Sequence, residues 1–371
     1  MATMVATIPP ARPMARTAPA GARAGRAGRR ATAMTDVPTG GTNDIDPENH
    51  AGGARATGPR PRAGTTAPVA ERPAREGWQH TGSRDGTRIG WRRGGRPQAT
   101  AVPVVLCNGI ACSVDYWTDL VARLEATRPV VQWDYRGHGA SAAPEDRGAV
   151  TIDDVMDDLD AVLHAAGITR AVFVGHSFGV QVVLEAARRW PERVAAVAAV
   201  AGAPGAPLPA RATRPLHAVE RLHARTPART ASAWQRWWRS PLTRVAAHAL
   251  GGTSRAAPRP VMQAYYEHVA SRDVPLLLAM MRAMQEHDAG DVPARLAVPL
   301  LALAGDADRL TSLPVMTKLA LDAPDGELVV RHGGTHTLPA EHPAWVWEHL
   351  RRLLQRIDVA PGHLDVPATG A

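Results

Sequence analysis

The sequence predicts an α/β protein whose central sheet is mostly parallel and whose chain is interrupted once by a helical insertion. Short, continuous apolar runs alternate with segments of helical periodicity, as expected for strands that are covered on both faces. This alternation stops at 203–205 and resumes near residue 298, and the segment between has a helical period. An α/β domain carrying one helical insertion is therefore the expected architecture.

The expected strands are the apolar runs, at 102–107, 130–133, 171–174, 194–200, 298–304 and 328–331. The expected helices follow them, at 116–125, 151–166, 180–190, 313–321 and 344–357. Segments 78–81 and 87–93 flank Asp85-Gly86, a tight-turn signal, and predict an antiparallel hairpin at one sheet edge. Thr151 is the expected N-cap of its helix, with Asp153 and Asp154 near the positive end.

Composition divides the chain into five segments: a tail (1–77), a first core part (78–204), a helical cap (205–290), a second core part (291–358) and a C-terminal tail (359–371). Residues 1–77 hold 11 arginines against 6 acidic residues, contain no aromatic residue and show no hydrophobic periodicity. Such a segment cannot bury enough apolar surface to offset its ordering entropy, so we expect it to be disordered.

The charge pattern gives little support to a nucleic-acid partner. Of the formal net charge of +8, residues 1–77 contribute +5 without the interleaved aromatic residues that a binding face would need. Cys107 and Cys112 are the only cysteines, and neither belongs to a metal-ligand pattern, so we expect buried thiols, no metal and no cofactor. No run of 18 apolar residues and no signal peptide is evident, which makes the cytoplasm the expected location.

The chemistry centres on Gly175-His176-Ser177-Phe178-Gly179, which lies between an expected strand and an expected helix. This is the G-x-S-x-G pattern in its strand–turn–helix context. Glycines are needed on both sides of Ser177 because the chain packs too tightly there for a Cβ. The helix that follows directs its free N–H groups at the serine oxygen. Ser177 is therefore the expected nucleophile.

A serine needs a base, and the base needs an orienting acid. His336 follows the last expected strand and two glycines, whereas His332 and His342 are weaker alternatives. Asp308 is the expected acid, and Asp306 the alternative, which we expect to brace the loop. The preceding strand offers no acid, because none occurs between Arg193 and Val219.

The oxyanion hole requires two backbone N–H groups aimed at one point. Phe178 follows the nucleophile and supplies one. The loop after 102–107 reads Asn108-Gly109-Ile110-Ala111-Cys112, and Ile110 is the expected second donor. The charged cluster 134–139 is interpreted as a buried turn in which Asp134 and Arg136 satisfy loop backbone, without chemistry.

These motifs together resemble the α/β-hydrolase superfamily over about residues 78–357. The usual His-Gly of the oxyanion loop is Asn108-Gly109 here, which is similar to the Asn-Gly-Ile of intracellular polyhydroxyalkanoate depolymerases and related hydrolases. The resemblance implies an acyl-enzyme route at Ser177 that cleaves a carboxylic ester or thioester. A serine, rather than an aspartate, at this position argues against the epoxide hydrolase and haloalkane dehalogenase branches.

Three alternatives stay open on the same scaffold: a non-catalytic binding protein, an acyltransferase and a cofactor-free peroxidase. The acyl group, the leaving group and the oligomeric state are not predicted.

Two side-chain patterns in the expected cap indicate either internal packing or contact with a ligand or surface. Met280, Met281 and Met284 lie on an apolar helical stripe that either packs the cap or walls an acyl pocket. Trp234, Trp237 and Trp238, with neighbouring arginines, share one predicted helix face, which either packs on the core or contacts a membrane or hydrophobic surface.

Overall fold

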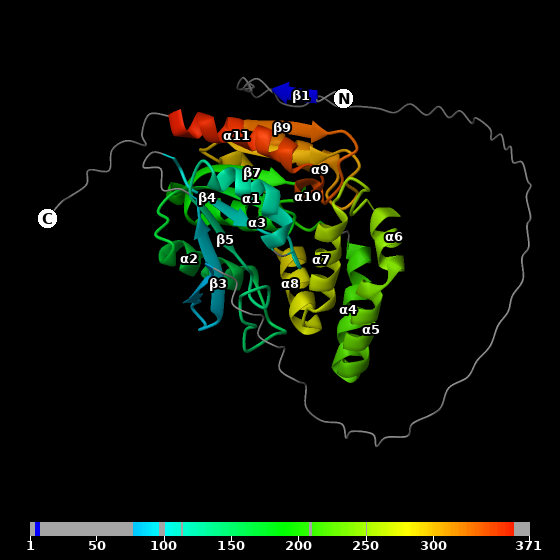
Figure 1. Cartoon of the computed structure of the whole chain (residues 1–371). Coiled ribbons are helices and arrows are strands. Elements are labelled where there is room, and N and C mark those ends of the chain that lie inside the picture. Colours follow the sequence, from blue (N-terminus) through cyan, green and yellow to red (C-terminus); the bar gives the residue numbers. More distant parts are fainter. Residues whose placement is uncertain are drawn as a thin grey trace, which may run out of the picture. The chain divides into compact units, whose positions relative to one another are not determined.

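The computed structural model describes residues 4–7, 77–95, 101–112, 114–207, 210–249 and 251–359 (Figure 1). The C-terminal tail and almost all of the N-terminal tail lie outside these residues. The prediction of disorder is wrong for one short stretch, because Met4–Thr7 forms strand β1, which pairs antiparallel with strand β9.

A nine-stranded sheet forms the centre, in the order β1-β9-β8-β7-β6-β4-β5-β3-β2. The strands after β1 are β2 (Gln79–Gly82), β3 (Arg88–Gly94), β4 (Val104–Cys107), β5 (Val130–Trp133), β6 (Ala171–His176), β7 (Val194–Val200), β8 (Leu300–Gly305) and β9 (Gly326–Arg331). Strands β4 to β9 pair in parallel, whereas the predicted β2–β3 hairpin adds to β5 antiparallel at the edge. The mostly parallel sheet predicted from the apolar runs is confirmed.

Helices cover both faces of the sheet. They are α1 (Thr118–Glu125), α2 (Ile152–Ala165), α3 (Phe178–Arg189), α9 (Leu313–Asp322), α10 (Leu338–Glu341) and α11 (Pro343–Val359). Helices α1 and α11 bury one set of alternating strand residues, including Val104 and Val172. Helices α2, α3 and α9 bury the other set, including Val105 and Phe173. Successive strand side chains point to opposite faces, so this sorting follows from the strand period of two.

Among the described residues, five α-helices lie between β7 and β8, in the region of the predicted insertion, which we call the cap. They are α4 (Ala210–Arg225), α5 (Pro227–Arg239), α6 (Pro241–Ala249), α7 (Arg259–Ala270) and α8 (Val274–Glu286). Figure 1 shows α7 and α8 beside the core and α4, α5 and α6 farther out. Helix α8 packs through Leu276 and Met280 into the same core layer as α2 and α3. Every helix in the described part of the chain is too short or too polar to cross a bilayer.

Thr151 caps α2 as predicted. Its hydroxyl accepts the N–H of Asp154, and the Asp154 carboxylate accepts the N–H of Thr151, which completes a capping box. Strand β1 and the short helix α10 were not predicted from the sequence.

Glycine is required where α3 begins, because the helix passes against the end of β4. A Cβ on Gly179 would lie 2.1 Å from the carbonyl oxygen of Cys107, and one on Gly175 would lie 2.3 Å from the carbonyl oxygen of Gly179. These neighbours are backbone atoms, so no side-chain rotation can relieve the overlap. The sequence interpretation of the two glycines is therefore correct.

We expect Gly179→Ala to lower the free energy of unfolding by about 2 kcal/mol or more, because the added methyl group forces α3 away from β4. Urea unfolding followed by circular dichroism measures this change. Gly148→Ala is the matched control, since the nearest atom to its added Cβ would lie 3.5 Å away. Equal stability of the two variants would show that α3 can move without cost.

Candidate active site

Ser177 sits at the junction of β6 and α3 in a backbone conformation that L-residues rarely adopt. Its φ is 54° and its ψ is −118°. The turn is supported on both sides, because the N–H of Ser177 donates to the carbonyl of Val200, and the N–H of Val180 donates to that of Ser177. Residues held in such conformations persist only where the surroundings enforce them, and they concentrate at functional sites.

The structure brings Ser177, His336 and Asp308 together from three separate loops. The Nε2 atom of His336 lies 2.9 Å from Ser177 Oγ, and its Nδ1 atom lies 3.0 Å from Asp308 Oδ2. All three loops follow parallel strands, namely β6, β8 and β9, whose carboxyl ends meet at one edge of the sheet. Of the alternatives, His332 is exposed and bonds to Asp306, and His342 lies between α10 and α11.

Hydrogen bonds fix the orientation of the Asp308 carboxylate. Its Oδ1 accepts the N–H groups of Leu310 and Thr311, at 2.8 and 3.0 Å, and its Oδ2 accepts the Thr311 hydroxyl at 2.6 Å. Burial alone would raise the pKa of this carboxyl, but the bonds from His336 and Thr311 and the charge of His336 bring it below its usual value. The ionised carboxylate can only accept, so Nδ1 of His336 carries the proton and Nε2 is left to accept from Ser177.

Asp306 does not reach the triad. Its two carboxylate oxygens accept the N–H of Gly333 and bond to Nδ1 of His332, both at 2.7 Å. The carboxylate therefore holds the loop that leads to His336, which is the bracing role that the sequence suggested.

The oxyanion loop lies against the nucleophile. A Cβ on Gly109 would lie 3.1 Å from Ser177 Cβ, a tight contact, so glycine favours this close approach of the loop. Farther along this loop, the N–H of Ala111 donates to Nε2 of His138 at 3.2 Å. For the N–H groups of Ile110 and Phe178, the described part of the chain provides no acceptor. These are the two donors expected from the sequence.

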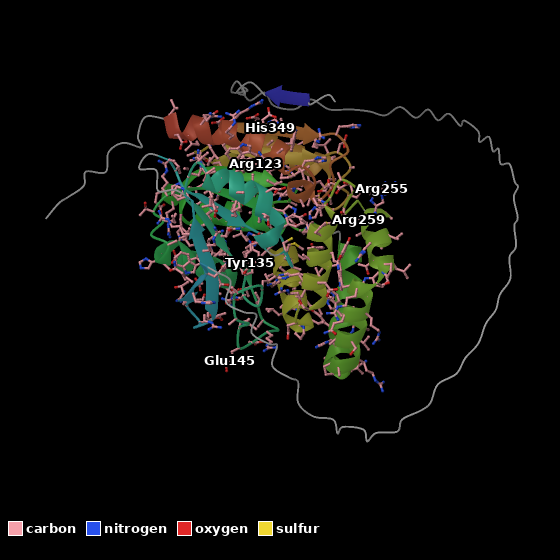
Figure 2. The ribbon with its side chains drawn as sticks, in the orientation of Figure 1. Arg123, Tyr135, Glu145, Arg255, Arg259 and His349 are labelled. Carbon is pink, nitrogen blue, oxygen red and sulfur yellow. The ribbon has the colours of Figure 1, made fainter. Side chains whose placement is uncertain are left out.

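Three side chains, those of Tyr135, Trp117 and His138, form hydrogen bonds with the oxyanion loop. The Tyr135 hydroxyl donates to the carbonyl of Asn108 at 2.7 Å, and Trp117 Nε1 donates to the Asn108 side chain. Tyr135, labelled in Figure 2, is buried. Ala111 has a φ of 61°, and the bond from its N–H to His138 stabilises that left-handed conformation. The Asn108 side chain thus contributes to loop position, in addition to any effect of its backbone.

The cluster 134–139 was only partly understood from the sequence. Asp134 accepts the N–H of Ala140, as expected of a buried turn. Arg136, however, bonds mainly to carboxylates, with Asp158 at 2.7 Å and Asp85 at 2.9 Å. The residue of this cluster that reaches the site is His138, whose importance was missed because its partner Ala111 is 27 positions away.

His176 and Glu341 were also missed. His176 donates through Nε2 to the carbonyl of His336 at 2.8 Å, and so fixes the backbone of the base. The buried Glu341 carboxylate accepts the N–H groups of Thr335 and Ser254 and the hydroxyl of Thr337. Because Ser254 belongs to the cap, this carboxylate ties the cap to the loop that carries His336.

The predicted methionine stripe divides between two environments. Met280 is fully buried in the main core, and Met284 packs against the same layer. Only Met281 lies beside the oxyanion loop, in a cluster with Ile110 and Leu277. The prediction that all three wall a pocket is therefore wrong for Met280, which has no surface to offer a ligand.

The three tryptophans do not form one exposed face. Trp234 donates to the carbonyl of Val269 at 2.9 Å, and Trp238 packs between Trp234 and Tyr266. Trp237 remains 49% exposed. Trp234 and Trp238 are thus packed, although these contacts are with α7 of the cap itself, and of the three Trp237 is the one left half exposed.

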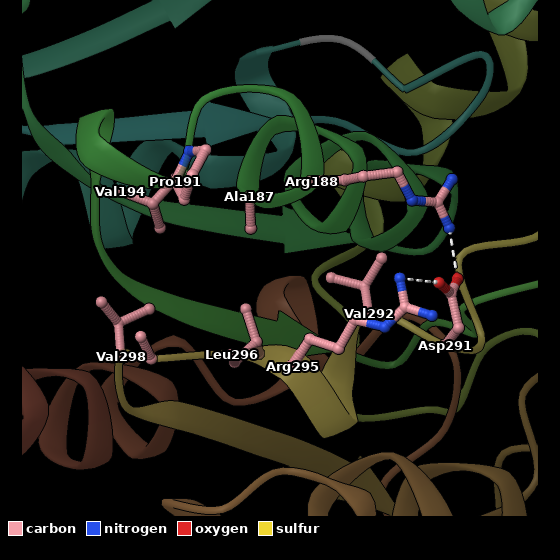
Figure 3. A pocket seen from close by; sticks show the side chains of 10 residues that line it. Ala187, Arg188, Pro191, Val194, Asp291, Val292, Arg295, Leu296 and Val298 are labelled. Carbon is pink, nitrogen blue, oxygen red and sulfur yellow. Dashed lines mark hydrogen bonds and ion pairs between the residues drawn. The ribbon is translucent and has the colours of Figure 1, made fainter.

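A cavity of about 240 Å³ lies far along the strands from this site (Figure 3). It is lined by residues near the amino ends of β7 and β8, such as Val194 and Val298, whereas the triad lies at the carboxyl ends. Its two arginines, Arg188 and Arg295, both pair with Asp291. We assign this cavity no part in the chemistry.

Both cysteines are buried and unpaired, as expected, and burial raises the pKa of each thiol to about 12. They are therefore thiols rather than thiolates at neutral pH. Among the described residues, no group of three or more His, Cys, Asp or Glu side chains is arranged to hold a metal ion.

The fold and this site together define the class of protein. The sequence model of the alpha/beta hydrolase fold matches residues 102–343, so the chain belongs to that family. Solved structures agree on the fold: a hydrolase from Pseudomonas aeruginosa PA01 superposes with a TM-score of 0.62 at 24% identity, covering 75% of this chain and 98% of that one. An esterase from Thermogutta terrifontis gives 0.61 at 21% identity, covering 76% and 99%.

Sequence relatives match over shorter stretches. A putative carbamate hydrolase, RutD, from Caulobacter segnis is 34% identical over 114 residues, which is 31% of this chain and 42% of that protein. Epoxide hydrolase A from Mycobacterium tuberculosis is 36% identical over 115 residues, 31% of this chain and 35% of that protein. The chain thus matches less than half the length of these relatives.

Two buried histidines predict how stability depends on pH. Burial, helped by the charge of Arg272, lowers the pKa of His138 from its ordinary 6.5 to about 3. Burial, helped by the charge of His336, does the same for His176. In the unfolded chain each imidazole gains a proton as the pH falls through about 6.5, but in the folded chain it stays neutral down to about 3.

Acidification across this window therefore favours the unfolded state, by up to about 1.4 kcal/mol per pH unit for each histidine. We expect His138→Gln to make the free energy of unfolding less dependent on pH between about 6.5 and 3, as measured by urea unfolding at several pH values. His332→Gln is the control, because that side chain is 89% exposed. Parallel pH profiles for wild type and His138→Gln would contradict the neutral, buried state of His138.

Proposed function

We propose that this protein is a serine hydrolase that cleaves a carboxylic ester or thioester through an acyl-enzyme intermediate. The observation that carries the proposal is the continuous hydrogen-bonded line from Asp308 through His336 to Ser177 Oγ, with contacts of 3.0 and 2.9 Å. This arrangement is what converts a weakly nucleophilic hydroxyl into a competent one.

The chemistry follows from these positions. His336 Nε2 takes the hydroxyl proton as Ser177 Oγ attacks the acyl carbon, and the ionised Asp308 stabilises the resulting imidazolium. The N–H groups of Ile110 and Phe178 donate to the oxyanion. His336 then returns the proton to the departing alkoxide or thiolate, which leaves the acyl group on Ser177. Water, deprotonated by the same imidazole, repeats the attack and releases the acid.

The comparisons support this class without defining the substrate. Relatives and structural neighbours are named as a carbamate hydrolase and as esterases, and both names describe attack at an acyl carbon. Another relative is named an epoxide hydrolase. Opening an epoxide through an alkyl ester requires a carboxylate nucleophile, and this chain has a serine hydroxyl at the strained turn, which favours acyl chemistry.

The triad itself is tested with a fluorophosphonate probe, which reacts with an activated serine. We expect a single adduct on Ser177, detected by mass spectrometry of the full-length chain, and none on Ser177→Ala. We expect Ser177→Ala to lower kcat for p-nitrophenyl esters about 10⁴-fold or more, and Asp308→Asn to lower it about 10⁴-fold because the imidazole loses its orientation.

The alternatives give different results in the same experiment. A folded protein without an adduct would indicate a binding module. Faster transfer of the acyl group to an added alcohol than to water would indicate an acyltransferase. Faster transfer of the acyl group to hydrogen peroxide would indicate a peroxidase, and this measurement is included because one relative is named a putative non-heme haloperoxidase.

Met281 provides a separate prediction on the acyl group. It is half-buried beside Ile110, so shortening it enlarges the space next to the expected oxyanion donor. We expect Met281→Ala to shift the preferred p-nitrophenyl ester toward longer acyl chains. Met280→Ala is the matched control, and we expect it to lower the free energy of unfolding by about 2–5 kcal/mol without changing that preference. An unchanged preference in Met281→Ala would place the acyl pocket elsewhere.

A further inference from the structure

The three outer helices of the cap carry a concentrated positive charge. Residues 210–249, which span α4, α5 and α6, hold eight arginines and one glutamate, a formal charge of +7. By contrast, residues 77–204 of the core hold 13 arginines and 14 acidic residues. The basic balance of the folded part therefore belongs to these helices and does not extend over the whole surface.

Much of this charge is not neutralised within the protein. Arg221, Arg225, Arg229 and Arg236 are exposed, and none has a carboxylate partner in the described ranges of the chain. Several arginines of the core do have such partners, as in the contacts of Arg136 with Asp158 and of Arg193 with Asp160. Figure 2 labels two further exposed arginines, Arg255 and Arg259, near the start of α7.

The same helices expose large apolar side chains. Leu222 is 53% exposed, Trp237 49%, Leu242 65% and Val245 66%. They account for half of the large apolar side chains found exposed among the described residues. Because Trp234 and Trp238 turn inward onto α7, Trp237 is left pointing away from the cap interior.

We propose that α4, α5 and α6 dock the protein on an anionic lipid surface. Arginines attract phosphate headgroups, and exposed leucine, valine and tryptophan side chains insert at the boundary between headgroups and acyl chains. A nucleic acid would be attracted by the same arginines, but it would gain nothing from Leu242 and Val245. Mixed cationic and apolar exposure on short, non-spanning helices fits a lipid surface better.

This docking surface is connected to the candidate active site through the backbone. Helix α6 leads into Gly251, whose carbonyl accepts the N–H of His336 at 3.3 Å. Three residues later, the N–H of Ser254 donates to Glu341, which also holds Thr335. The segment after α6 therefore contacts both the lipid-facing helices and the loop that carries His336, so docking brings the site close to the membrane.

The test is co-sedimentation of the full-length protein with vesicles of phosphatidylcholine alone, and of phosphatidylcholine and phosphatidylglycerol in equal parts. We expect binding to the anionic vesicles only, with loss at about 1 M salt, where charges are screened within about 3 Å. Arg229→Glu/Arg236→Glu lowers the partition coefficient about tenfold or more, and Leu242→Ser lowers it severalfold. Brominated lipid quenches the tryptophan fluorescence of wild type more than that of Trp237→Ala.

Matched controls lie on the core. Arg351→Glu/Arg352→Glu changes two exposed arginines of α11, and Leu321→Ser changes a side chain that is 54% exposed, so neither affects binding. The N-terminal tail is also arginine-rich, so binding that survives Arg229→Glu/Arg236→Glu would overturn the proposal. Equal binding to neutral vesicles would overturn it as well. So would a wild-type protein that does not bind vesicles but binds DNA in a way that Arg229→Glu/Arg236→Glu abolishes.

Sedimentation does not depend on catalysis, so this result is independent of the proposed function. Hydrolysis of a short, water-soluble ester serves as a folding control, and we expect it to be unchanged in the surface variants. Binding to anionic vesicles without esterase activity would support the proposed docking surface and contradict only the proposed hydrolase function.

Discussion

The close approach of α3 to the end of β4 is the constraint on which the site depends. Gly175 and Gly179 leave no room for a Cβ, and one on Gly109 would be tightly crowded, so glycines let the nucleophile turn and the oxyanion loop meet. The strained φ of 54° at Ser177 follows from the same crowding, since the chain must reverse between a strand and a helix that nearly touch. The nucleophile turn and the oxyanion loop are thereby held against each other, which is the preorganisation that the proposed acyl transfer would use.

Two buried, neutral histidines support this geometry. His138 accepts one backbone N–H of the oxyanion loop, and His176 donates to the backbone of His336. Each must keep a defined tautomer to do so, and burial keeps both uncharged at neutral pH by lowering their pKa values to about 3. A protonated ring would lose the acceptor that holds Ala111 in its left-handed conformation, so the desolvation that lowers the pKa also maintains the loop.

The cap is joined to the catalytic loops by hydrogen bonds as well as by apolar packing. Glu341 links Ser254 to Thr335, Arg309 donates to the carbonyl of Ala249, and the carbonyl of Gly251 accepts the N–H of His336. These contacts come from residues beside the base and the acid. The segment after α6 is therefore hydrogen-bonded to the loops that carry His336 and Asp308, whereas α4 packs on α5 and α8 and pairs with α8 through Glu220 and Arg282.

The sequence predicted the strands and the triad because both depend on local patterns. Apolar runs indicate covered strands, and parallel strands place their following loops at one edge, which brings Ser177, Asp308 and His336 together. His138, His176 and Glu341 could not be assigned in the same way, because their partners are 27 to 160 positions away or depend on a helix, α10, that is only one turn long. The spacing of Trp234, Trp237 and Trp238 placed them on one helix face but could not show that α7 covers only two.

The names of similar proteins stand for different reactions, so the side chain at the strained turn bears on which chemistry this site can perform. The family includes proteins named esterase, carbamate hydrolase, haloperoxidase and epoxide hydrolase, so the fold alone does not specify the reaction. At the strained turn, a carboxylate would attack an alkyl carbon and form an ester to the enzyme, whereas the Ser177 hydroxyl needs a base and an electrophilic acyl carbon. Asp308 orients His336 toward Ser177 Oγ, and the N–H groups of Ile110 and Phe178 have no acceptor among the described residues, which supports the proposed base and oxyanion site. The residues around Ser177 are thus consistent with one another for acyl chemistry, and the likeness of Asn108-Gly109-Ile110 to depolymerase loops remains a prediction about which acyl groups are accepted.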